Sequence, residues 1–212
     1  MLVAATGMFA QNIDLTSGWD GSEAANPFGP PNTETYGQTI TLASAAALSS
    51  FNVRMNCPAN VTARAHVYAW NGTRATGADL LDGTSITITG TGAFQTVSFN
   101  TGSINLPAGQ YVLFASTSQD TQTSVACRWG VQSDIYAGGQ FVFINNGTDT
   151  TQWTSTGWSN FSGQDLAFQA IFGASQPVGT PTLSEWGMIL LACLLGGAAF
   201  LKLKSKSQVS VN

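Results

Sequence analysis

Apolar and polar residues alternate through the middle of this 212-residue chain. Phe51, Val53 and Met55 are separated by polar residues. The same spacing recurs over 86–89, 95–100 and 166–172. A period of two puts the apolar side chains on one face of an extended strand. Each such strand has one face to bury, so the pattern predicts β-sheets that pack against each other.

Turn signals punctuate the chain at 71–72, 82–83, 107–109, 138–139 and 146–147. Between them, further strands are expected over 36–42, 61–70, 110–117, 124–131 and 140–145. About nine short strands without an amphipathic helix are typical of an all-β protein with an antiparallel β-sandwich fold. We expect a jelly-roll-like sandwich over residues 12–173, followed by a linker over 174–181.

The charge distribution argues against nucleic acid as a partner. Charged residues make up only 8% of the chain, against roughly 25% in ordinary soluble domains. All three lysines lie in the last eleven residues, whereas residues 1–185 hold four arginines against eleven acidic residues, a net charge of −7. Such a surface repels phosphate backbones.

The C-terminal part has the composition of a membrane segment. Residues 187–201 contain no charged side chain, and Lys202, Lys204 and Lys206 follow. A helix from Trp186 to Leu203 would extend about 27 Å, close to the ~30 Å of a hydrocarbon core. Lysines on the cytoplasmic side would leave the sandwich outside. We therefore expect one C-terminal transmembrane helix within a tail over 182–206.

The residues ahead of this helix resemble a known sorting signal. They are Pro181, Thr182, Leu183, Ser184, Glu185, Trp186 and Gly187. Motif, apolar segment and basic end, in that order, resemble the IPTL-CTERM signal, a relative of the PEP-CTERM tails of Gram-negative bacteria. The family pattern begins with Ile, where this chain has Thr180. The resemblance implies an exosortase-type transpeptidase as partner and a route through the inner membrane and periplasm to the cell surface.

Two further segments fit an exported protein. Residues 1–11 resemble the end of a signal peptide without its basic start, so we expect a remnant whose true start lies upstream. Short pieces of the middle region, including 36–39, 67–70, 136–139 and 165–168, resemble ectodomains of PEP-CTERM-type surface proteins. That resemblance implies a fold and a location but no activity.

Cysteine and histidine usage limits the chemistry. Outside the membrane segment only Cys57 and Cys127 remain, and in an oxidising compartment they can pair as a disulfide. Two free buried thiols are the alternative. His66 is the only histidine, which argues against hydrolases that need a histidine base and against a zinc cluster. We expect no enzyme.

Two binding hypotheses remain open. By alternation, His66, Tyr68 and Trp70 share one strand face, and Trp129 lies near a loop; aromatic rings of this kind either stack on sugars or pack in the core. Carboxylates in turns can bind Ca²⁺ and so hold neighbouring loops together. The best placed are Asp79, Asp82, Asp149 and Asp165. The alternative is that these aspartates lie in solvated turns and bind no ion. Apart from this structural calcium, no cofactor is expected.

The sequence therefore predicts an exported, surface-displayed structural or interaction protein that is sorted and anchored through its C-terminal signal. A carbohydrate-binding, lectin-like module of the extracellular matrix, with a polysaccharide as ligand, is the alternative.

Overall fold

A computed structural model describes residues 12–120, 123–161, 163–173, 187 and 190–195. The chain divides into two units, Met1–Ser175 and Gln176–Asn212. The first unit consists of strands, as the alternating pattern predicts, and its described residues contain a single one-turn helix, α1 (Gln152–Ser155).

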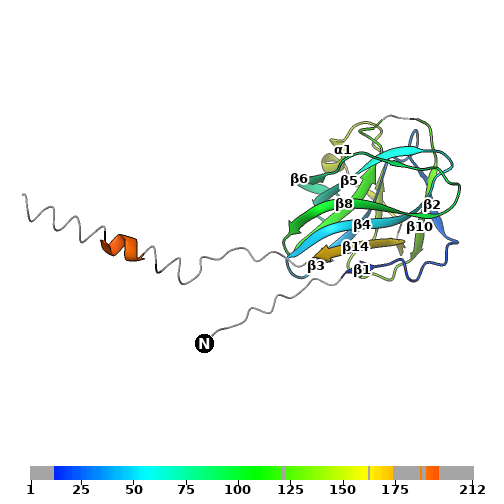
Figure 1. Ribbon diagram of the computed structural model, residues 1–212. Helices are drawn as coiled ribbons and strands as arrows, with labels where there is room; N and C mark the ends of the chain where they lie inside the picture. The colour runs from blue at the N-terminus through cyan, green and yellow to red at the C-terminus, as the bar shows by residue number, and fades with distance from the viewer. Residues whose placement is uncertain (1–11, 121–122, 162, 174–186, 188–189, 196–212) are drawn as a thin grey trace, which may run out of the picture. The chain divides into compact units, whose positions relative to one another are not determined.

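Two antiparallel sheets, each of seven strands, make up the first unit (Figure 1). The first sheet contains β1 (Ile13–Asp14), β2 (Ala24–Phe28), β4 (Ala46–Asn56), β8 (Gln95–Leu106), β10 (Cys127–Ser133), β13 (Gln164–Leu166) and β14 (Phe168–Gly173). The second contains β3 (Thr35–Leu42), β5 (Val61–Trp70), β6 (Ala75–Asp82), β7 (Ile86–Ile88), β9 (Gly109–Ser116), β11 (Phe141–Ile144) and β12 (Ser159–Asn160). This arrangement is consistent with the predicted β-sandwich.

The prediction of about nine strands was too low, because β1, β7, β12 and β13 have only two or three residues each and are too short to show an alternating pattern. The strand predicted over 124–131 lies at Cys127–Ser133. The jelly-roll connectivity stays a prediction. The strand orders β2-β10-β4-β8 and β3-β9-β5-β6 favour it, because most successive strands alternate between the sheets.

The main core lies between the sheets. Along β4, Phe51, Val53 and Met55 are buried while Asn52 and Arg54 face outward, as the period of two predicts. A second apolar cluster lies on the other face of the second sheet. It contains Tyr68, Trp70, Ala75, Val112, Phe114, Val142, Ile144, Trp153 and Trp158. Because Trp153 belongs to α1, the segment around this short helix covers part of that sheet.

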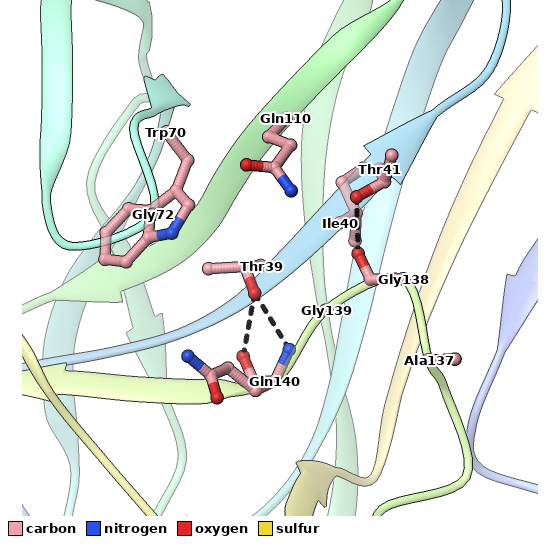
Figure 2. A pocket seen from close by; sticks show the side chains of 10 residues that line it. All are labelled: Thr39, Ile40, Thr41, Trp70, Gly72, Gln110, Ala137, Gly138, Gly139 and Gln140. Atoms are coloured by element: carbon pink, nitrogen blue, oxygen red, sulfur yellow. Dashed lines mark hydrogen bonds between the residues drawn. The ribbon is translucent and has the colours of Figure 1, made fainter.

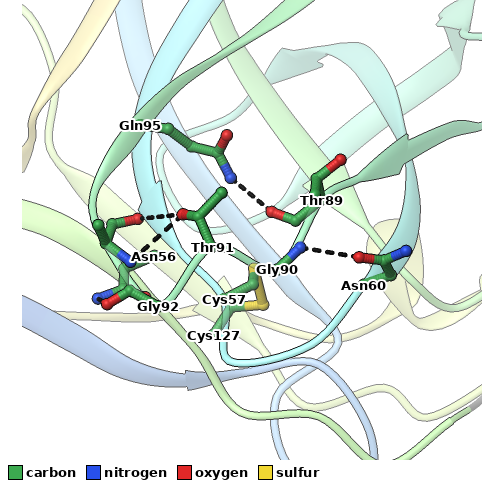
Figure 3. Close-up of a disulfide and its surroundings, with 10 residues drawn as sticks. Asn56, Cys57, Asn60, Thr89, Gly90, Thr91, Gly92, Gln95 and Cys127 are labelled. Atoms are coloured by element: carbon green, nitrogen blue, oxygen red, sulfur yellow. Dashed lines mark hydrogen bonds between the residues drawn. A yellow bond between two sulfur atoms is a disulfide. The ribbon is translucent and has the colours of Figure 1, made fainter.

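The predicted disulfide between Cys57 and Cys127 is confirmed. It joins the end of β4 to the start of β10, beside the loop that leads into β8 (Figure 3). In this loop Gly90 donates a hydrogen bond to Asn60 Oδ1 at 2.9 Å, and a Cβ at Gly90 would lie 2.3 Å from the Ala59 carbonyl carbon. Glycine is therefore required where the loop passes over the turn between β4 and β5.

In the second unit, Gly187 and residues 190–195 are helical. Leu190, Leu191, Leu194 and Leu195 are each more than half exposed. No helix among the described residues is long and apolar enough to cross a membrane. Most of the tail over 182–206 lies outside the described residues, as do segments 1–11 and 174–181.

Candidate functional site

The aromatic side chains considered for sugar binding are buried. His66 is fully buried, Tyr68 and Trp70 are each 9% exposed, and Trp129 is 1% exposed. The first three share one face of β5, as predicted, but that face carries the second apolar cluster, and Trp129 belongs to the main core. Such burial leaves almost no ring face free for stacking, so the structure favours the core role that the sequence also allowed.

The His66 ring lies in an aromatic environment beside a carboxylate. Its centroid is 5.0 Å from that of Phe114 and 4.5 Å from that of Trp153. His66 Nδ1 hydrogen-bonds to Asp79 Oδ2 at 2.7 Å. Burial raises the pKa of the neighbouring Tyr68 hydroxyl, and the charge of Asp79 adds to this effect.

A network of charged groups continues from this pair. Asp82 Oδ1 lies 3.9 Å from His66 Nδ1 and 3.6 Å from Arg64 Nη1. Arg64 Nη2 also bonds Asp120 Oδ1 at 3.1 Å. His66, Asp79 and Asp82 offer ligand atoms within 4.8 Å of one another. Arg64 and His66 already pair with these carboxylates. We therefore interpret the network as a set of internal pairs.

The four aspartates considered for calcium do not form one site. Asp79 and Asp82 lie together on β6, whereas Asp165 is on β13 of the other sheet. Asp165 is fully buried and accepts hydrogen bonds from Gln38 Nε2 and the Ile135 and Tyr136 amides. Asp149 is exposed and bonds the Thr151 amide and hydroxyl at the start of α1. These hydrogen bonds give Asp149 and Asp165 local structural roles, and a structural calcium at any of the four aspartates stays a prediction.

A hollow of about 280 Å³ opens on the outer side of the second sheet (Figure 2). Its walls come from β3, from the ends of β5 and β9, and from the loop before β11. The lining side chains include Thr39, Thr41, Trp70, Gln110 and Gln140. Of these only Trp70 was considered from the sequence. Alternation of Thr39 and Thr41 with Ile40 on β3 was the signal that could have identified the others.

Several polar groups in this hollow are already bonded. Thr41 Oγ1 donates to the Gly138 carbonyl at 2.7 Å, and Thr39 Oγ1 accepts from the Gln140 amide at 2.8 Å. Gly139 lies against β3 so closely that a Cβ there would be 1.7 Å from the Thr39 carbonyl oxygen. The loop is therefore fastened to the strand, and Gln110 and Gln140 are the side chains with most freedom to meet a ligand.

Of the sorting-signal residues, only Gly187 is among those that the structure describes; it is helical and exposed. Pro181, Thr182, Leu183, Ser184, Glu185 and Trp186 lie outside the described residues. The signal is therefore defined by its sequence.

Comparison with protein families matches residues 180–204 to the IPTL-CTERM motif. No curated protein and no solved structure matches the chain. The chain thus carries the sorting signal that its C-terminal residues resemble, and this signal places it among exported proteins of the cell surface.

Proposed function

We propose that this chain is a structural or interaction domain displayed on a bacterial cell surface, to which an exosortase-type transpeptidase delivers it. The observation that carries the proposal is the order of its parts. A disulfide-bonded β-rich unit is followed by an IPTL-CTERM motif at residues 180–204. A disulfide suits an oxidising compartment outside the cytoplasm, so the ectodomain and its signal support the same destination.

The membrane stage of this route is also part of the proposal. Residues 187–201 are free of charge, and three lysines follow. Leu191 and Leu195, in the helical segment over 190–195, are 56% and 63% exposed, an arrangement suited to surrounding lipid. Lysines halt translocation at the cytoplasmic face. The motif would then stand at the outer interface of the inner membrane, within reach of a periplasmic sorting enzyme.

A non-enzymatic role agrees with the environment of the single histidine. His66 is fully buried, and its Nδ1 is bonded to Asp79. A general base must reach the proton that it abstracts, and a ring enclosed by Phe114 and Trp153 cannot reach a substrate in solvent. This supports a protein that acts by binding or by building a surface layer.

Carbohydrate binding is the second candidate function. The rings first considered for it are buried, so it depends on a different surface. The outer face of the first sheet carries partly exposed aromatic rings beside two arginines.

Surface delivery can be tested in a host that contains the sorting enzyme. The wild-type chain should be digested by a protease added to intact cells, whereas Pro181→Ala and Trp186→Ala variants should stay protected and fractionate with the inner membrane. Thr180→Ala is the matched control, because that position already departs from the family pattern. Equal protease access for wild type and all variants would contradict the proposal.

A further inference from the structure

The outer face of the first sheet brings two arginines close together. Arg128 on β10 is opposite Asn56 on β4, and Arg54 lies two residues earlier on β4. Positions related in this way are diagonal neighbours on one face of a sheet, roughly 7–8 Å apart. Beyond this pair the two strands separate, because the Arg54 amide donates to the Ala167 carbonyl and the Ala167 amide donates to the Gly130 carbonyl, which places Ala167 between them.

Two aromatic rings lie on the same face. A Cβ at Gly130 would be 2.8 Å from Trp19 Cε2, so the absence of a side chain at Gly130 lets the Trp19 ring pack directly on the sheet. Trp19 meets Phe94 edge to face, with ring centroids 4.8 Å apart. The Arg128 guanidinium lies over Phe94 at 5.8 Å. Trp19 and Phe94 are partly exposed and Arg128 is exposed. We call Trp19, Phe94, Arg54 and Arg128 the arginine face.

The two guanidinium groups of this face are not neutralised within the described structure. Arg64 is the only arginine that forms a salt bridge there, and Arg54 Nε has no hydrogen-bond partner among the described residues. The charge of Arg54 acts on Asp14, but the Asp14 pKa is lowered mainly by hydrogen bonds from Thr16 and only in its smallest part by Arg54. Glu23 lines the hollow beside Arg128 but forms no salt bridge with it. Neither guanidinium group of the arginine face is therefore held in a salt bridge within the described structure.

We propose that the arginine face binds a polysaccharide that carries carboxylate groups. Guanidinium groups pair with carboxylates through two parallel hydrogen bonds, and aromatic rings beside them stack on the apolar faces of sugars. The net charge of −7 over residues 1–185 disfavours a densely charged phosphate or sulfate polymer more strongly than a chain with at most one carboxylate on each sugar unit.

A hollow next to the arginine face gives such a polymer room to continue. It has a volume of about 490 Å³ and is lined by Arg128, Glu23, Asn26, Phe161 and Gln164, among others. Phe161 is 45% exposed. The Phe161 ring and the Gln164 amide, which line this hollow with Arg128, would allow a neighbouring sugar unit to be held beside the carboxylate contact. This inference deepens the second candidate function and uses surface display only as the setting in which the polymer is met.

Titration calorimetry on the full chain in mild detergent, with polygalacturonate as the probe, tests the inference. Wild type should bind, and Arg128→Gln and Arg54→Gln should each weaken binding about tenfold or more, as expected for loss of a charged hydrogen bond. Arg74→Gln, which makes the same charge change outside this face, should bind as wild type does. Fully methyl-esterified polygalacturonate, which keeps the sugar backbone without its charges, should bind much more weakly.

Three results would overturn the inference. They are no binding of polygalacturonate by wild type, an equal loss in Arg74→Gln, and binding of dextran sulfate at least as tight as that of polygalacturonate. The last result would show general attraction of polyanions. A chain that reaches the surface but ignores polygalacturonate would refute this inference alone. A chain that binds the polymer but is never exported would refute the proposed function alone.

Discussion

Gln38 and Asp165 join the two sheets of the sandwich through a buried hydrogen bond. Gln38 Nε2 on β3 donates to Asp165 Oδ1 on β13 at 2.7 Å, and Gln38 Oε1 accepts from the Leu166 amide at 2.9 Å. Both side chains are fully buried. Asp165 Oδ2 also accepts from the Ile135 and Tyr136 amides, so four donated hydrogen bonds converge on one inter-sheet contact.

Asp165→Asn should lower the free energy of unfolding at neutral pH by about 1–3 kcal/mol. Three hydrogen-bond donors point at the Asp165 carboxylate, and the Asn side chain would turn its own N–H group toward one of them. Urea unfolding would measure the change. Glu23→Gln is the control, since it also removes one carboxylate charge but at an exposed position, and it should change stability by less than about 0.5 kcal/mol. An effect no larger than that of the control would contradict this role.

The stability difference between wild type and Asp165→Asn should also depend on pH. Burial raises the pKa of Asp165 above its ordinary value of 3.8, so the folded state holds this proton more tightly than the unfolded chain does. The resulting stability is fully present below pH 3.8 and falls as the pH rises through the raised pKa. The stability difference between wild type and Asp165→Asn should therefore be larger in acid than at neutral pH, and the opposite order would refute the assignment.

Removing the disulfide should destabilise the ectodomain strongly. Cys57 and Cys127 are 70 residues apart in sequence, and loss of such a bridge by paired Ser substitution should cost about 2–5 kcal/mol in unfolding free energy. In an unreduced chain that still retains the tail, a thiol reagent should label one cysteine, the exposed Cys193, and the sorted form without the tail should show no labelling. Labelling of all three in chains that retain the tail would show that the bridge does not form.

Trp70 distinguishes a core residue from a sugar platform. It is 9% exposed and lies edge to face with Trp158, with ring centroids 5.7 Å apart. Trp70→Ala should lower the free energy of unfolding by about 3–5 kcal/mol, as for other buried aromatic truncations. Phe161→Ala, which removes a ring that is 45% exposed, should cost much less. A stable Trp70→Ala protein would show that the ring is not part of the second apolar cluster.

Gly139 tests the loop that walls the hollow on the second sheet. An added methyl would lie 1.7 Å from the Thr39 carbonyl oxygen, so Gly139→Ala must displace the loop and should cost about 1–3 kcal/mol, as overpacking does. Gly157→Ala is the control, because no atom lies within 4 Å of the place that an added Cβ would take. Thermal unfolding of the two variants compares them, and equal midpoints would contradict the close contact.

The sequence predicted the features that depend on local pattern. The alternation of Phe51, Val53 and Met55 with polar residues gives both the strand and its buried face, and the even number of cysteines outside the tail indicated their pairing. Contacts between distant segments were not predictable in this way. Gln38 and Asp165 are 127 residues apart, and nothing in either local sequence indicates that they meet.

The same limit applies to the binding surfaces. The β5 face was recognised from its period, but the covering segment that contributes Trp153 and Trp158 follows from tertiary packing. Trp19 and Arg128 share a face only because β10 pairs with β4 and because Gly130 has no side chain. Their relationship therefore became visible only with the fold.

The central claim, that the C-terminal signal is read by a sorting enzyme, is tested most directly by intact-mass measurement of the surface form. The IPTL-CTERM match at 180–204 runs into the basic end that sorting should remove. Sorting at this signal should give a mature protein that lacks all residues after about 187, including Lys202, Lys204 and Lys206. A surface form that retains these lysines in a host with the sorting enzyme would show that the tail is an ordinary anchor, and would contradict the claim.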